Sequence, residues 1–163
     1  MKKIFLAIAM LLSVAGYSQI QSASLTASGL TCSMCSKAIY KALLKVPSVD
    51  KVDVDIEKSS YTIIFDKNAA VSPEALKKAV EGAGFAIAKL DLIAAVPKTS
   101  ITTDTKLTLQ GTAYRFIRSN GKTIQGVQTL TVIDKSYLSP QEWKRYAKDV
   151  TAKRESGVYF VAL

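Results

Sequence analysis

The chain has 163 residues, of which 48% are hydrophobic and 8% aromatic, with 8 glycines and 4 prolines. This composition is typical of a folded globular protein and excludes collagen-like, heptad-repeat and low-complexity chains. Histidine is absent, which excludes His general bases, Ser–His and Cys–His nucleophile pairs and His-ligated metal sites. An ordinary enzyme is therefore not expected, and two cysteines remain as the principal soft ligands.

The net charge of +9 is unevenly spread along the chain. Residues 22–92 carry 9 basic and 8 acidic side chains, whereas residues 93–163 carry 11 basic and 5 acidic ones. A basic half can indicate nucleic acid, anionic lipid or an acidic partner, although it is most often a solvated surface. We expect no nucleic-acid binding, because the N-terminus carries an export signal.

That signal occupies residues 1–18. Lys2 and Lys3 form a basic start, an apolar run follows from Ile4 to Ala15, and Gly16-Tyr17-Ser18 supplies small residues for cleavage before Gln19. The apolar run is too short to span a bilayer, which takes about 20 residues. We therefore expect an exported, periplasmic or secreted protein without stable membrane insertion after cleavage.

Residues 22–92 have the pattern of one compact unit. Alternation and helical spacing of apolar residues predict strands over 22–27, 49–56, 61–65 and 85–90, and helices over 33–45 and from Ser72 to Gly82 or Gly84. Ser72 and Pro73 are a typical N-cap and first helical residue. The order βαββαβ predicts an α+β, ferredoxin-like sandwich.

The remainder has a different pattern. Residues 93–104, rich in Thr and containing Pro97, are interpreted as a linker. Residues 105–163 predict a small β-rich α+β unit of unknown role, with a hairpin at Asn120-Gly121, a short helix capped by Ser139 and Glu142, and a last strand over 158–163. Tyr114 and Trp143 are expected to be core or interface residues.

The two cysteines form a CxxC motif, Cys32-Ser33-Met34-Cys35, between a glycine-containing loop and the start of a helix. The unpaired N–H groups and the dipole at a helix N-terminus favour thiolates. Two thiolates without imidazole or carboxylate suit Cu(I) or Hg(II), whereas structural zinc takes four ligands. From the residues alone, a metal site, a thioredoxin-like redox pair and an inert disulfide all remain open.

Several segments together resemble the heavy-metal-associated domain family, which includes copper chaperones, domains of copper-transporting P-type ATPases and a periplasmic mercury-binding protein. They are the CxxC segment 29–35, Val46-Pro47-Ser48-Val49, Val52-Asp53-Val54, the segment 71–76, and Gly82-Ala83-Gly84-Phe85. The resemblance covers about residues 24–90. It implies that Cys32 and Cys35 are the metal ligands, that Leu30 is an apolar plug under the loop, and that Phe85 is an apolar cover beside the site. Met34 is expected to be exposed and is a weak candidate for a third sulfur.

Together these observations predict an exported protein that binds a soft ion, Cu(I) being favoured over Hg(II), Zn(II) or Cd(II). The ion would pass to a partner protein by ligand exchange. One alternative is a periplasmic thiol–disulfide oxidoreductase that uses the same two cysteines. Another is an interaction module that docks an acidic partner through its basic half. The chain is expected to be a monomer or a dimer bridged by metal.

Overall fold

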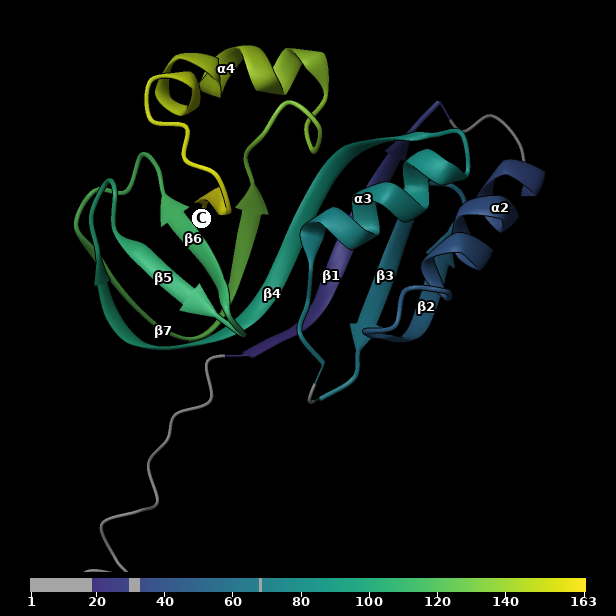
Figure 1. Ribbon diagram of the computed structural model, residues 1–163, viewed down its shortest axis with the longest axis horizontal. Helices are drawn as coiled ribbons and strands as arrows, with labels where there is room; N and C mark the ends of the chain where they lie inside the picture. The colour runs from purple at the N-terminus through teal and green to yellow at the C-terminus, as the bar shows by residue number, and fades with distance from the viewer. Residues whose placement is uncertain (1–18, 30–32, 68) are drawn as a thin grey trace, which may run out of the picture.

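A computed structural model describes residues 19–29, 33–67 and 69–163 (Figure 1). The signal segment 1–18 lies outside the described residues. The elements in chain order are β1 (Gln19–Ser28), α2 (Ser33–Leu43), β2 (Val49–Asp55), β3 (Ser60–Phe65), α3 (Pro73–Gly82), β4 (Ala86–Ile101), β5 (Lys106–Leu109), β6 (Thr112–Phe116), β7 (Lys122–Val132), α4 (Pro140–Thr151) and β8 (Val158–Ala162).

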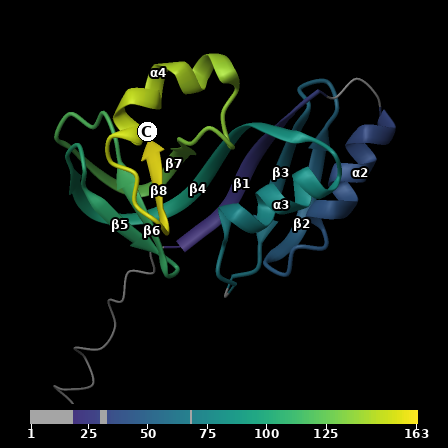
Figure 2. The same ribbon diagram turned by 45° about the horizontal axis from the view of Figure 1, so that its top comes forward.

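All eight strands belong to one sheet, in the order β2-β3-β1-β4-β7-β8-β6-β5. The first four strands pair antiparallel, and α2 and α3 cover one face of them (Figures 1 and 2). The predicted ferredoxin-like arrangement of the first half is thereby confirmed. Strand alternation also holds, since Ala23, Leu25 and Ala27 are all buried.

Helix α3 begins and ends as its sequence predicts. Ser72 is the N-cap, and its hydroxyl accepts a hydrogen bond from the Ala75 N–H at 3.3 Å. At the other end, Gly84 has φ +88, a left-handed conformation that residues with a Cβ rarely adopt. The Phe85 N–H donates to the Val80 carbonyl and the Gly84 N–H to that of Glu81, which is a Schellman motif.

Edge strand β2 departs from expectation at its end. Val52 is buried, but Val54 is 37% exposed and Ile56, expected to continue the strand, lies in the following turn at 59% exposure. Because β2 has a neighbour on one side only, less of the molecule covers it. Periodicity alone cannot reveal that a strand lies at an edge.

The linker expected over residues 93–104 is wrong for residues 93–101, which continue strand β4. This strand pairs with β1 through Ala95 and with β7 from Asp91 to Ile101. Its pairing with β7 shifts register between Val96 and Thr99, and exposed Pro97 lies within that shift. A bulge tolerates proline because no ladder hydrogen bond is required of its missing N–H.

The predicted hairpin at Asn120-Gly121 is also wrong. Strand β6 pairs with β5 and, in parallel, with β8, while β7 pairs with β4 and β8. Strand β8 therefore separates the two strands that were expected to pair. The tight hairpin lies instead at Gln110 and Gly111, both with positive φ, between β5 and β6.

Helix α4 and strand β8 occur as predicted, and Ser139 caps α4 by accepting from the Glu142 N–H at 3.3 Å. The Glu142 side chain does not accept a hydrogen bond from the Ser139 N–H, as a full capping box would require. That N–H donates to the Ala88 carbonyl at 2.9 Å and ties the start of α4 to β4. No helix within the described residues is long and apolar enough to cross a bilayer.

One buried cluster runs through both halves of the sheet, from Leu25 and Ile63 in the first half to Tyr114 and Leu130 in the second. Helix α4 packs over a separate small cluster, which consists of Ile117, Ile133, Leu138, Val150 and Phe160, with Trp143 and Tyr146 at its margin. Tyr114 is fully buried and Trp143 half-buried, as expected of core residues.

Tyr137 joins the second half to helix α3. Its hydroxyl donates to the Glu74 carboxylate at 3.4 Å, and the Lys77 ammonium, itself 2.9 Å from Glu74, lies 5.9 Å from the Tyr137 ring centroid. Burial raises the pKa of Tyr137 far above that of an ordinary tyrosine. The two halves therefore share a sheet, a core and this polar contact.

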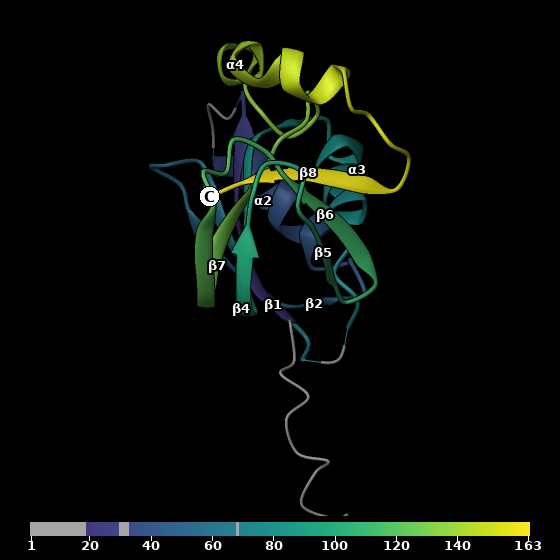
Figure 3. The same cartoon turned by 90° about the vertical axis from the view of Figure 1, so that its left-hand side faces the viewer.

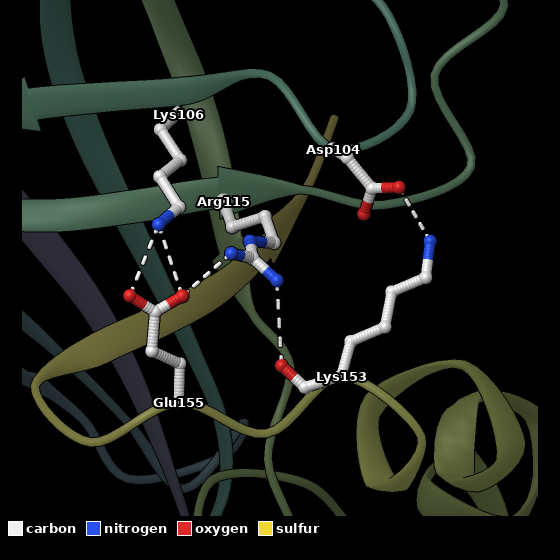
Figure 4. Close-up of polar contacts among 5 residues, drawn as sticks. All are labelled: Asp104, Lys106, Arg115, Lys153 and Glu155. Atoms are coloured by element: carbon white, nitrogen blue, oxygen red, sulfur yellow. Dashed lines mark hydrogen bonds and ion pairs between the residues drawn. The ribbon is translucent and has the colours of Figure 1, made fainter.

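A surface network holds the connection between α4 and β8 against strands β5 and β6 (Figure 4). Glu155 accepts from Lys106 at 2.9 Å and from Arg115 at 2.6 Å, and Lys153 pairs with Asp104. Lys106, and then Arg115, lower the pKa of Glu155. Because Glu155 is 46% exposed, these pairs contribute little stability.

Candidate metal site

The loop between β1 and α2 begins where β1 pairs with the first residue of β4. Ser28 lies opposite Ala86, and its hydroxyl donates to the Ala86 carbonyl at 3.2 Å. Gly29 then turns the chain with φ +79, a conformation that favours glycine. Leu30 and Cys32 follow but lie outside the described residues, so the predictions made for them stay predictions.

Cys35 is the third residue of helix α2 and is partly exposed. The first turn of this helix contains no acidic residue. The helix N-terminus therefore favours a negatively charged sulfur at this position, with no neighbouring carboxylate on that turn to oppose it.

Tyr61 lies directly under this turn, a contact that the sequence did not reveal. Its side chain is fully buried, and its hydroxyl donates to the Ser36 carbonyl at 3.4 Å. Burial, together with the nearby Cys35, raises the pKa of Tyr61. Alternation along β3 predicted that Tyr61 faces the core, but not which helix turn it meets.

The two side chains expected beside the site are both described. Phe85 is half-buried, packs against the main core and immediately precedes Ala86, which pairs with Ser28. Its backbone therefore lies next to the start of the loop, and its role as an apolar cover stays a prediction. Met34 is 74% exposed, which confirms its expected exposure.

No alternative metal centre emerges from the part of the chain that the structure describes. Within it, no group of three or more Cys, His, Asp or Glu side chains could hold an ion. A four-ligand zinc site within one copy therefore has no support in these residues.

Two open hollows flank helix α2. The larger, of about 630 Å³, lies between α2 and α3 over alanines such as Ala42 and Ala79, with Lys41, Lys45 and Lys78 among its lining residues. The smaller, of about 240 Å³, lies on the β2 side between Tyr40, Val54 and Ile56. Neither gathers an acid, a base and a nucleophile, as a catalytic pocket would.

Comparison with known proteins places this sequence in a family. The model of the heavy-metal-associated domain matches residues 24–86. The periplasmic component of the mercuric transport protein of Shigella flexneri is 40% identical over 86 residues, which are 93% of that protein and 52% of this chain. The chain belongs to the heavy-metal-associated domain family. The Pseudomonas fluorescens protein of the same name matches this family member with equal identity and coverage.

Two solved structures are similar to part of this chain. Oxidized MerP from Ralstonia metallidurans is 38% identical, with 42% of this chain and 93% of that one covered and a TM-score of 0.39. A copper-binding domain of HMA7, a P-type ATPase, is 32% identical, with 40% and 88% covered and a TM-score of 0.37.

Proposed function

We propose that this protein is an exported carrier of a soft metal ion, which it binds between the thiolates of Cys32 and Cys35 and passes on by ligand exchange. The observation that carries the proposal is the placement of Cys35, partly exposed, in the first, acid-free turn of α2. From the CxxC spacing, we expect the sulfur of Cys32 at the same helix start.

The donor set determines the class of ion. Two thiolates without histidine or a neighbouring carboxylate prefer thiophilic ions such as Cu(I) and Hg(II) to Mg²⁺, Ca²⁺ or Mn²⁺. The relatives that match over most of their length are named for mercuric transport. This supports Hg(II) as cargo at least as strongly as the Cu(I) favoured from the sequence.

Release requires that an incoming ligand reach the ion. The partial exposure of Cys35 and the high exposure of Met34 leave the helix start accessible to a partner's thiolate. That thiolate would attack the bound ion as one of the two cysteine sulfurs leaves, so that no oxidation or reduction occurs. Transfer then follows the relative affinities of the two sites, as expected of a carrier rather than an enzyme.

Export is part of the proposal. It rests on the signal-like segment 1–18 and on the periplasmic location in the names of the relatives. A mature protein that begins at Gln19, determined by intact mass after periplasmic extraction, would support it. Recovery of the full-length chain from the cytoplasm would contradict it.

The function is tested by anaerobic titration of the reduced chain from Gln19 onward. Cu(I) is added against a chromophoric chelator and Hg(II) against a competing thiol, with Cys32→Ser/Cys35→Ser as the control. We expect one equivalent of ion to be held, and to be lost in the control. Failure to hold either ion, together with turnover of a disulfide substrate, would replace the carrier with a thiol–disulfide oxidoreductase.

A further inference from the structure

The outer face of helix α4 carries a row of basic side chains that the metal site does not use. Lys144, Arg145 and Lys148 are exposed, whereas Trp143 and Tyr146 on the opposite side pack over the small core under the helix. We call the three exposed residues the α4 basic face. Their spacing of one, three and four residues places them on one side of the helix.

Acidic residues do not neutralise this face. Of the two acids on α4, Glu142 is engaged at the N-cap with Ser139, and Asp149 pairs with Arg118 at 2.7 Å. Arg118 also lies 4.7 Å from the Tyr146 ring centroid, so that the pair is fixed along the flank of the helix. The positive charge of the α4 basic face therefore projects into solvent.

Helix α4 lies at the same end of the molecule as the start of the CxxC loop. Figures 1 and 3 both show α4 at the top, where β1 also ends. The Ser139–Ala88 hydrogen bond fixes this placement, because Ala88 lies two residues after Ala86, the partner of Ser28. A surface that attracts α4 would also face the end of the molecule that carries Cys35.

We propose that the α4 basic face binds an anionic phospholipid surface and so turns the CxxC end of the protein toward a membrane. A flat anionic surface fits this face better than a protein partner, because the three side chains are exposed on one side of the helix and none of them lines the small hollow beside α4, which includes Arg118 and Tyr146. A protein partner gains most of its affinity from side chains seated in such hollows, whereas an anionic lipid surface attracts exposed basic side chains through their charge. This inference does not depend on which ion the cysteines hold.

The test is co-sedimentation of the chain from Gln19 onward, which contains every described helix and strand, with vesicles. One set is neutral phosphatidylcholine and the other contains 30% phosphatidylglycerol. We expect binding to the anionic vesicles at low salt, no binding to the neutral ones, and loss of binding as NaCl screens the charges.

Substitutions then locate the binding face. Lys144→Gln/Arg145→Gln/Lys148→Gln is expected to weaken binding by about a hundredfold, since each basic residue near an anionic surface contributes roughly a factor of five. The matched control, Lys41→Gln/Lys45→Gln/Lys78→Gln, removes the same charge from the α2–α3 hollow. We expect the control to retain most of the binding. Circular dichroism and melting temperature confirm that both variants remain folded.

Three results would overturn the proposal. The first is the absence of binding to anionic vesicles at low salt. The second is an equal loss of binding in both triple variants, which would make net charge the cause. The third is tight binding to poly-glutamate, but not to vesicles, through the same three residues, which would assign the face to an acidic protein. All three leave metal binding at the cysteines unaffected, so the proposed function is tested separately.

Discussion

Replacement of Leu130 by alanine tests whether the two halves unfold as one unit. Leu130 in β7 is fully buried and lies opposite Leu92 in β4. The same buried cluster contains Leu25 and Ile63 of the first half. Leu130→Ala therefore leaves a cavity in a core that both halves share, rather than in a detachable C-terminal unit.

The expected cost follows from complete burial. Leu→Ala at fully buried positions lowers the free energy of unfolding by about 3–4 kcal/mol, since both the transfer free energy of the lost methyl groups and the cavity contribute. In a chain of this size, that loss corresponds to a melting temperature lower by about 10 °C. Val127→Ala on the same strand is the control, because Val127 is 60% exposed. It should change stability by no more than about 0.5 kcal/mol.

Two probes report on the two halves. Trp143, the sole tryptophan, reports on the second half by fluorescence, and amide hydrogen exchange in β1 and β3 reports on the first. We expect Leu130→Ala to shift both probes by the same free energy, in one transition. If the amides of β1 and β3 in Leu130→Ala keep their wild-type protection while the Trp143 fluorescence shows a loss of stability, the idea of a shared core is refuted.

Three further predictions concern single interactions. Ser72→Ala removes the α3 N-cap and should lower the urea-unfolding free energy by about 1 kcal/mol. Gly84→Ala forces an alanine into φ +88 and should cost about 1–2 kcal/mol by thermal unfolding, whereas Gly82→Ala, with open space and no positive φ, should cost nothing. Burial raises the pKa of Tyr137 above its unfolded value of about 10. The contribution of neutral Tyr137 to the free energy of unfolding is therefore complete below about pH 10 and declines progressively as the pH rises above that value. Urea unfolding between pH 9 and 11 should show this decline, and Tyr137→Phe should reduce its slope.

Local signals predicted the first half well. The alternation of Ala23, Leu25 and Ala27, the cap at Ser72 and the glycine after α3 are all short-range features, and each determines its structure through its immediate neighbours. The same holds for the cap of α4 at Ser139. These features suffice for a βαββαβ unit because its elements follow one another closely.

In the second half, the predicted linker and the predicted hairpin were wrong because the strand pairing there is long-range. Residues 93–101 resemble a linker in composition, yet they continue strand β4, which pairs with β1 on one side and with β7 on the other. The Asn120-Gly121 turn satisfies the local rule for a hairpin, but β8, more than 35 residues later, occupies the place between β6 and β7. No local pattern encodes which strand fills that place.

At the candidate site too, local features were predictable from the sequence and tertiary contacts were not. The CxxC spacing and the helix start were sufficient to predict Cys35 at the first turn of α2. The contact of Tyr61 with the Ser36 carbonyl depends on how β3 packs beneath α2, and thus on the tertiary structure. Cys32 lies outside the described residues, so its role as the second ligand is a prediction.

X-ray absorption spectroscopy of the loaded, reduced protein tests the central claim most directly. Spectra at the copper or mercury edge report which atoms surround the bound ion. We predict sulfur scatterers alone, two per ion, and no specifically bound ion in Cys32→Ser/Cys35→Ser. Nitrogen or oxygen scatterers in the first shell, or an unchanged spectrum in the double variant, would contradict a soft-metal site at Cys32 and Cys35.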